Sequence, residues 1–396
     1  MPGGLDWVAM SASHLPIDPG PMAVGTWSGG RFMHFGEPID DQRFLALITP
    51  DETIRTVITA DVYGAGEADA MLGRALRAAG RPRDRMCVVG AVGHDFYDGE
   101  RNGAKGFPRF TDPALRGPHG YADYLRMATE RSLQRCGTDR FDLLLLHNPD
   151  RIGYTSEAVW NGMAAVRDAG LTRMIGVAPG PANGFTLDVI DCLERFGDMI
   201  DWAMIILGPL EPWPGELVLG AASEHRVRVI TRVVDYGGLL YDDLRADHAL
   251  IRGDHRGFRP EGWIEGGRAR LDAIRPIARR SGLTMIQLAC QWNLAHDAVR
   301  CVVPTLIQEA GPDARPVEDK RAELAALPDV SRLSAEDIEA IRRAGDNTGS
   351  MDLKGANPAY AGHPQPDRWA LDEQLAAVAQ RWRIDPARDL AHQVPA

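Results

Sequence analysis

Short apolar runs, separated by amphipathic segments, recur along most of the chain at intervals of roughly thirty residues. Their composition is that of strands buried on both faces. The runs cover residues 22–25, 56–59, 86–89, 143–146, 174–177, 204–207, 227–233 and 301–304. Alternation of such runs with helices is typical of βα units built around a parallel sheet. Eight runs predict an α/β fold, a closed (β/α)8 TIM barrel.

The segments between the runs show helical periodicity. Residues 71–79 place Met71, Leu72 and Leu76 on one helical face, and Gly80 follows as a helix end. The same pattern covers residues 125–136. We interpret these apolar positions as packing residues, since such side chains are most often buried.

Three segments exceed a minimal barrel. Residues 94–120 form a long loop after the third run, rich in Gly, Pro and charge, and residues 241–267 form a second excursion after the seventh. We expect the first to cover the C-terminal ends of the strands, because loops this long are usually functional. We assign residues 1–345 to one barrel domain with a loop insertion at 94–120. Residues 346–396 are assigned to a C-terminal extension packed on the barrel.

Composition limits the partners. The net charge is −11 and the sequence pI is near 5.5, which argues against nucleic acid because phosphate binding needs clustered Lys and Arg. The five cysteines include no Cys-x-x-Cys pair, so we predict neither disulfides nor a zinc site. No signal-like N-terminus or long apolar segment predicts a membrane association. We expect a cytoplasmic protein with a small-molecule substrate and no metal, and leave a homo-oligomer open.

Two motifs end at predicted strand ends. Residues 57–64 are Val-Ile-Thr-Ala-Asp-Val-Tyr-Gly and residues 141–150 are Phe-Asp-Leu-Leu-Leu-Leu-His-Asn-Pro-Asp. With the strand order and the helical segment Gln-Leu-Ala-Cys-Gln-Trp at 287–292, they resemble the aldo-keto reductase family over residues 20–350. The resemblance implies a catalytic Asp, Tyr, Lys and His at four positions. Tyr63 and His147 match, whereas Ile58 and Ala91 stand in place of the Asp and the Lys.

The two apolar replacements change the expected chemistry. In the family, the Asp and Lys pair lowers the phenol pKa so that the Tyr can protonate a carbonyl that receives hydride. Removing one member of a buried pair would cost about 3 to 5 kcal/mol, whereas removing both is often neutral. Without the cation, Tyr63 is expected to have a pKa of about 10 or above. His147, with a reference pKa of about 6.5, is expected to exchange a proton near neutral pH.

Other polar residues follow the predicted strands and are expected to converge at the C-terminal face of the barrel, where barrel enzymes carry their sites. The candidate catalytic residues are Tyr63, His147 and Asp235. The candidate substrate-binding residues are Trp27, His94, Asn148, Glu211, Arg232 and Tyr236.

Nicotinamide binding is expected to be impaired. The resemblance implies Gly-Val-Ser-Asn at the end of the fifth strand, where this chain has Gly-Val-Ala-Pro at 176–179. The Gln and ring-stacking Tyr that it implies are absent from residues 204–213, and the phosphate-binding run after the eighth strand is altered at 303–307. Each unmet polar group would cost about 1 to 3 kcal/mol. We therefore expect no cofactor, with NADP(H) as the alternative.

The leading hypothesis is a lyase or isomerase that catalyses elimination, dehydration or isomerisation of a small carbonyl-containing, sugar-derived compound. In it, Tyr63 stabilises an enolate oxygen and His147 or Asp235 moves the proton. The alternative is an NADPH-dependent reductase of an aldehyde, ketone or sugar, in which Lys105 reaches back toward Tyr63. A second alternative is a non-catalytic binding or regulatory barrel.

Overall fold

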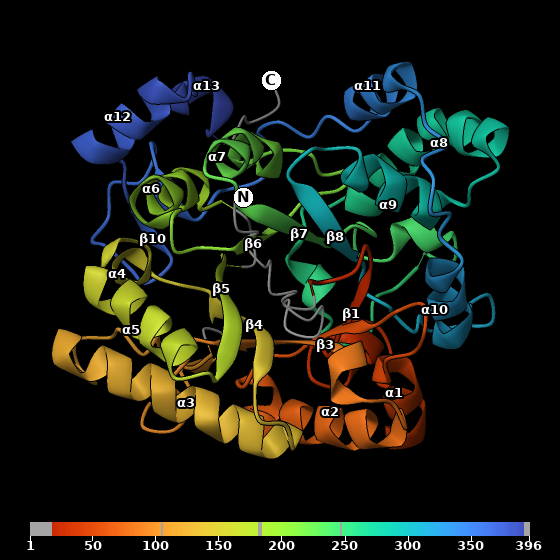
Figure 1. The fold of residues 1–396 in the computed structure, drawn as a ribbon. Helices are drawn as coiled ribbons and strands as arrows, with labels where there is room; N and C mark the ends of the chain where they lie inside the picture. Colours follow the sequence, from red (N-terminus) through yellow and green to blue (C-terminus); the bar gives the residue numbers. More distant parts are fainter. Residues whose placement is uncertain (1–17, 104–105, 181–183, 246–247, 392–396) are drawn as a thin grey trace, which may run out of the picture.

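The computed structural model describes residues 18–103, 106–180, 184–245 and 248–391. Eight parallel strands form one sheet in chain order, and a bridge between Met22 and Val302 joins its first and last strands (Figure 1). The strands are β1 (Ala23–Gly25), β2 (Thr56–Ile58), β3 (Cys87–Val92), β4 (Phe141–His147), β5 (Thr172–Ala178), β6 (Trp202–Ile206), β7 (Arg228–Arg232) and β8 (Val299–Val303). All eight coincide with the apolar runs, so the predicted (β/α)8 barrel is confirmed.

Helices surround the ring of strands. They are α1 (Asp41–Ile48), α2 (Glu67–Ala78), α3 (Tyr121–Cys136), α4 (Arg151–Thr155), α5 (Glu157–Asp168), α6 (Thr186–Phe196), α7 (Leu219–Glu224), α8 (Trp263–Ser281), α9 (Met285–Leu294), α10 (Val317–Ala325), α11 (Ala335–Ala344), α12 (Glu373–Arg381) and α13 (Pro386–Asp389). The boundaries follow local chemistry. Thr284 and Gln287 form a capping box at the start of α9, and α3 ends at Gly137, whose φ of 64° favours glycine. Every helix in the described part of the chain is too short or too polar to span a bilayer.

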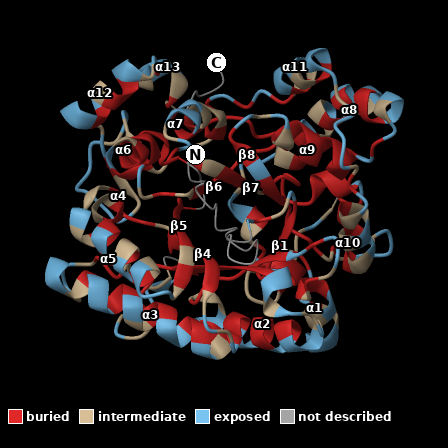
Figure 2. Ribbon diagram, in the orientation of Figure 1, coloured by how far each residue is buried: buried red, intermediate tan, exposed pale blue. Residues whose placement is uncertain are grey.

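Alternate residues of each strand fill the barrel, because successive side chains point to opposite faces. The interior cluster comprises Ala23, Trp27, Ile58, Ala60, Cys87, Val89, Ala91, Leu143, Leu145, Met174, Ala178, Trp202, Met204, Ile230, Cys301 and Val303. Ile58 and Ala91 therefore lie in an apolar interior. The opposite faces of the strands pack against the helices, whose outward faces are exposed (Figure 2).

The C-terminal extension lies against α6. Its strands β9 (Gly355–Asn357) and β10 (Arg368–Ala370) pair with each other, and α12 contacts α6. Asp188 of α6 accepts hydrogen bonds from the Ala356 main-chain N–H at 3.0 Å and from the Trp369 indole N–H at 2.9 Å. The buried carboxyl of Asp188 therefore fixes both strands of the extension.

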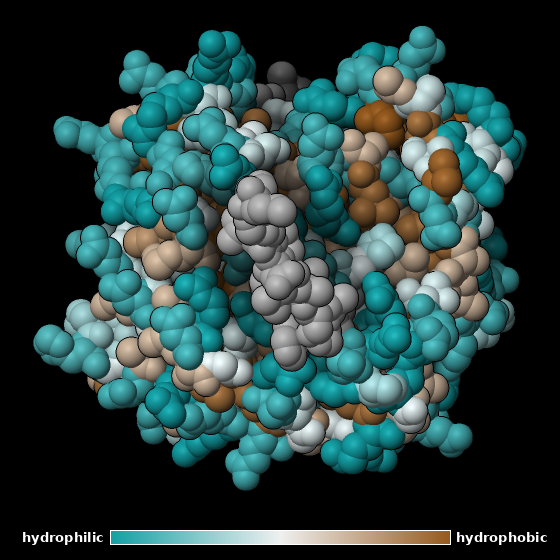
Figure 3. All heavy atoms as spheres, in the orientation of Figure 1, coloured by the Kyte–Doolittle hydropathy of each residue, from teal (hydrophilic) through white to brown (hydrophobic). Residues whose placement is uncertain are grey.

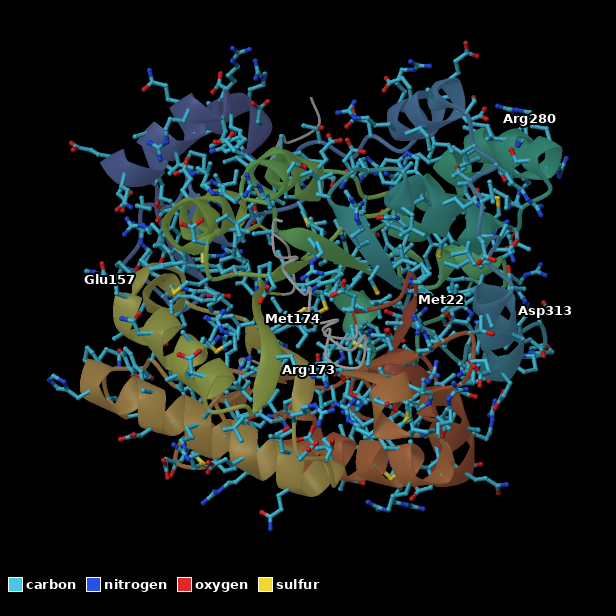
Figure 4. All side chains as sticks on the ribbon, viewed as in Figure 1. Met22, Glu157, Arg173, Met174, Arg280 and Asp313 are labelled. Carbon is cyan, nitrogen blue, oxygen red and sulfur yellow. The ribbon has the colours of Figure 1, made fainter. Side chains whose placement is uncertain are left out.

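The view in Figure 3 shows a surface that is mostly hydrophilic. Figure 4 labels Met22 and Met174, next to the starts of β1 and β5, inside the ring of helices, and Glu157 and Arg280 on outer helices. Met22 immediately precedes β1 and Met174 is the third of the seven residues of β5, so both lie nearer the N-terminal end of the barrel than the candidate site does.

Candidate active site

Aromatic rings from the ends of four consecutive strands gather at the C-terminal end of the barrel. Ring centroids are 6.5 Å apart for Trp27 and Tyr63, 5.7 Å for Tyr63 and His147, and 5.4 Å for His147 and His94. Trp27 lies over Gly25, where a Cβ would come within 2.4 Å of the indole. Four sequence-predicted site residues therefore form one group.

Arg232 brings a positive charge to this group from the far side of the barrel. It is the last residue of β7 and follows Ile230 by two positions, so its side chain also points inward. Its Nη2 donates to the carbonyl oxygens of Pro179 at 3.1 Å and Gly180 at 3.0 Å. Ala91 stands where the resemblance places a lysine, and Arg232 supplies a positive charge near Tyr63 from a different strand.

The Tyr63 phenol remains protonated at neutral pH. Burial raises the pKa of Tyr63 to about 12, and the positive charge of Arg232 opposes part of this rise. The predicted direction of the shift is confirmed. Lys105, which the reductase alternative invoked as the cation, lies outside the described residues.

His147 is a neutral imidazole. Burial, with Arg109 and Arg232 adding to the effect, lowers the pKa of His147 to about 3. The expectation that it exchanges a proton near neutral pH is therefore wrong. Its Nδ1 is buried and has no hydrogen-bond partner among the described residues. A neutral imidazole can still donate one hydrogen bond and accept another, so His147 can orient a substrate oxygen.

The long loop after β3 returns to the end of β4 through Arg109. Its Nε donates to the main-chain oxygen of Asn148, and its Nη1 lies 3.0 Å from His94 Nδ1. His94 Nε2 in turn lies 3.0 Å from the Asn148 side-chain amide. Burial, with Arg109 and His147, lowers the pKa of His94 well below its usual value. No spacing pattern in the sequence pointed to Arg109, because only the folded loop brings it to the site.

Asp235, Tyr236 and Glu211 occupy a neighbouring region. Asp235 accepts from the main-chain N–H groups of Gly238 and Thr305, both at 2.7 Å, so it joins the loops after β7 and β8. The other two bind arginines: Arg270 donates to the Tyr236 hydroxyl at 2.7 Å, and Arg259 donates to Glu211 at 3.1 Å.

Within the described residues no hydrogen bond, ion pair or ring contact joins Asp235, Tyr236 or Glu211 to Tyr63 or His147. Asp235 therefore makes no direct contact with the phenol or the imidazole in the described part of the chain, and its catalytic role stays a prediction. Among the same residues, no group of three or more His, Cys, Asp or Glu side chains could hold a metal ion.

The backbone is strained at this end of the barrel. Asn148, Val233 and Tyr236 have φ values of 48°, 59° and 50°, which non-glycine residues rarely adopt. Asn148 follows β4, and the other two follow β7. Such conformations cost about 1 to 3 kcal/mol each and cluster at functional sites. The strain therefore adds to the argument that this end carries the function.

The described residues do not fit a nicotinamide carboxamide in the way that the resemblance implies. The end of β5 presents Ala178, Pro179 and Gly180, none of which has a polar side chain, and Arg232 occupies two of its carbonyl oxygens. After β8, the carboxylate of Glu309 is bound by Arg256.

Known proteins share this fold. The 6-dehydroglucose reductase of Novosphingobium aromaticivorans is 26% identical over 311 residues, 72% of this chain and 81% of the relative. A glycerol dehydrogenase from Gluconobacter oxydans superposes with a TM-score of 0.63 at 21% identity, over 86% of this chain and 95% of that chain. An aldo/keto reductase from Klebsiella pneumoniae, solved with NADP and acetate, superposes with a TM-score of 0.53 at 20% sequence identity. The match covers 82% of this chain and 90% of that chain. The aldo/keto reductase family model matches residues 21–344. The chain therefore belongs to the aldo/keto reductase family.

Proposed function

We propose that this protein is an oxidoreductase that reduces a carbonyl group, or oxidises the corresponding alcohol, in a small sugar-derived compound. Relatives named as a reductase and a dehydrogenase support this reaction class. The family member solved with NADP supports NADP(H) as the redox partner. This oxidoreductase is the alternative hypothesis from the sequence. The leading hypothesis from the sequence, a lyase or isomerase, has no support among these relatives.

The observation that carries the proposal is the Tyr63 phenol beside the His147 imidazole, with the Arg232 guanidinium near both. Carbonyl reduction adds a hydride to carbon and a proton to oxygen. With a pKa of about 12, Tyr63 holds the proton that the oxygen must receive. Neutral His147 can orient that oxygen, and Arg232 stabilises the negative charge that develops on the oxygen or on the phenol.

A non-redox proton transfer on the same class of compound is the second candidate. One observation favours it: Arg232 occupies the Pro179 and Gly180 carbonyl oxygens at the end of β5, where the resemblance places the nicotinamide carboxamide. In this reaction the Tyr63 phenol would donate a hydrogen bond to an enolate oxygen. A base for the carbon-bound proton is not identified among the described residues.

The test is to incubate the purified protein with NADPH and a panel of aldehydes, ketones and keto sugars, and with NADP⁺ and the matching alcohols, following nicotinamide absorbance. We expect substrate-dependent turnover that Tyr63→Phe lowers by about 10²- to 10⁴-fold, the usual contribution of a positioned proton donor. Tyr121→Phe is the matched control, since Tyr121 is buried on α3 and, among the described residues, its hydroxyl makes a single long hydrogen bond of 3.4 Å to the Thr111 oxygen.

Three outcomes decide between the hypotheses. Loss of NADPH absorbance that requires substrate and Tyr63 supports the oxidoreductase. Nucleotide-independent loss of water, or exchange of a substrate carbon-bound proton in D2O observed by NMR, overturns it in favour of the second candidate. Absence of both reactions over the whole panel contradicts both and leaves the non-catalytic barrel.

A further inference from the structure

Two guanidinium groups at the candidate active site form no ion pair within the described residues. Glu211 acts on the charge of Arg232, and Asp150 and Asp367 on that of Arg109, from beyond ion-pair distance. Arg232 and Arg109 are half-buried, yet within the described residues neither has a carboxylate oxygen within 4.0 Å. Other arginines near the C-terminal face are paired: Arg256 with Asp254 and Glu309, and Arg259 with Glu211. Arg270 likewise forms no ion pair within the described residues, but its donors are taken by the Tyr236 hydroxyl and by main-chain oxygens. Arg232 and Arg109 are the two arginines whose charges act on His147.

Their remaining contacts do not use all their donors. Arg232 donates through Nη2 to two carbonyl oxygens, while its Nε is buried and has no partner among the described residues. Arg109 contacts the Asn148 oxygen and a ring nitrogen of neutral His94. None of these groups carries a negative charge, so both guanidiniums keep donors and charge for another group.

A partly desolvated cation without a counter-ion is unfavourable, and a bound anion would remove the penalty. The planar fork of arginine matches the two oxygens of a carboxylate. His147 Nδ1 is a third unsatisfied polar atom at the same place, on a residue that is only 6% exposed. Tyr63 and His147 are both neutral, so they do not oppose an anion.

We propose that Arg232, assisted by Arg109, binds the carboxylate of a small hydroxy or keto acid, such as a sugar acid, whose reacting oxygen then lies at Tyr63. This inference deepens the proposed function and rests on it for the placement of the reacting oxygen. It assigns the substrate to the anionic carbohydrates and related acids. Neutral sugars would leave both guanidiniums unpaired and therefore bind more weakly.

The test is calorimetric titration of the full, nucleotide-free protein with D-gluconate and with sorbitol, its neutral six-carbon analogue. We expect gluconate to bind at least about tenfold more tightly, and Arg232→Gln to weaken gluconate binding by about 10- to 100-fold, the loss of a charge-assisted hydrogen bond. Sorbitol binding should not change. Arg232→Lys keeps the positive charge but lacks the planar guanidinium. Its gluconate affinity should therefore lie between that of the native protein and that of Arg232→Gln.

Arg228→Gln is the matched control. Arg228 is on the same strand and also points inward, but it lies at the N-terminal end of β7, where it pairs with Asp18 and stacks on Trp202. Its loss removes the same charge and should leave gluconate affinity unchanged. Equal binding of gluconate and sorbitol, no gluconate binding, or equal losses in both arginine variants would overturn the proposal. Tighter binding of glucose 6-phosphate than of gluconate would overturn the carboxylate assignment.

A second readout is independent of calorimetry. The NMR signals of His147, assigned by their loss in His147→Asn, should shift on gluconate addition in the native protein and not in Arg232→Gln. Both binding measurements omit nucleotide, so their outcome is separate from the turnover assay. Gluconate binding without turnover would contradict the proposed function alone, and turnover of neutral sugars without gluconate binding would contradict this inference alone.

Discussion

Tyr63 and His147 owe their protonation states to burial. Among the residues that the structure describes, neither side chain has a carboxylate partner, and desolvation is the largest influence on both, raising the pKa of the phenol and lowering that of the imidazole. Arg232 lowers the pKa of both residues, so it favours the phenolate of one and the neutral form of the other. At the scale of single residues, the site is a neutral donor pair beside a cation.

The neutral state of His147 has a measurable effect on stability. An unfolded histidine protonates near pH 6.5, whereas folded His147 has a pKa of about 3. Its contribution to the free energy of unfolding is therefore complete above pH 6.5 and is lost as the pH falls to about 3, by up to about 1.4 kcal/mol per pH unit.

Urea unfolding at pH 7 and pH 5 should show a loss for the native protein that exceeds the loss for His147→Asn by roughly 2 kcal/mol. His363→Asn, a change at an exposed histidine, should behave like the native protein. Parallel pH dependence in all three proteins would contradict a depressed His147 pKa.

At the scale of the elements, the conformation of the loops that follow β7 and β8 depends on Asp235. Its two carboxylate oxygens accept main-chain N–H groups from the loops that follow these strands, so one side chain fixes the shape of both. Arg232 lies three residues earlier, at the end of β7. The carboxylate of Asp235 therefore orders the loop that begins directly after the site's cation.

Asp235→Asn should destabilise the protein by about 1 to 3 kcal/mol, because an amide nitrogen cannot accept one of the two buried N–H groups. Asp242→Asn is the control: this carboxylate is solvent-accessible and pairs with Arg275, so its loss should cost at most about 1 kcal/mol. Denaturant unfolding measures both. Full stability of Asp235→Asn with abolished turnover would instead support the catalytic role expected from the sequence.

At the scale of the whole molecule, Arg256 joins three loops of the C-terminal face. It binds Asp254 and Glu309 and donates to the Gly237 oxygen at 3.0 Å, while Asp254 accepts the Gly36 N–H at 2.8 Å. The loops after β1, β7 and β8 are thereby tied together through a side chain that is 2% exposed.

Arg256→Met should lower the free energy of unfolding by about 3 to 5 kcal/mol, because it leaves two buried carboxylates without a cation. The triple variant with Asp254→Asn and Glu309→Gln should recover much of this loss. Arg275→Met, which breaks an exposed pair, should cost at most about 1 kcal/mol. An equal effect of Arg256→Met and Arg275→Met on urea unfolding would contradict a stabilising role for the buried ion pairs of Arg256 with Asp254 and Glu309.

The barrel could be predicted because its signal is local. Each apolar run, such as residues 143–146 within β4, determines a buried strand by itself. The motif positions of Tyr63 and His147 likewise placed two site residues at strand ends. The interior positions of Ile58 and Ala91 followed from the same register.

What remained was decided by tertiary structure. The sequence by itself determined the order of strands and helices and which residues end each strand. Only the closed barrel brings Arg232 from β7 near the Tyr63 phenol and the His147 imidazole, and Arg109 from the loop after β3 near that imidazole. It also places the Asp235 carboxylate between two main-chain N–H groups and lowers the pKa of His147. The physical reason is that charge and desolvation act through space, between residues whose separation along the chain carries no record of their proximity.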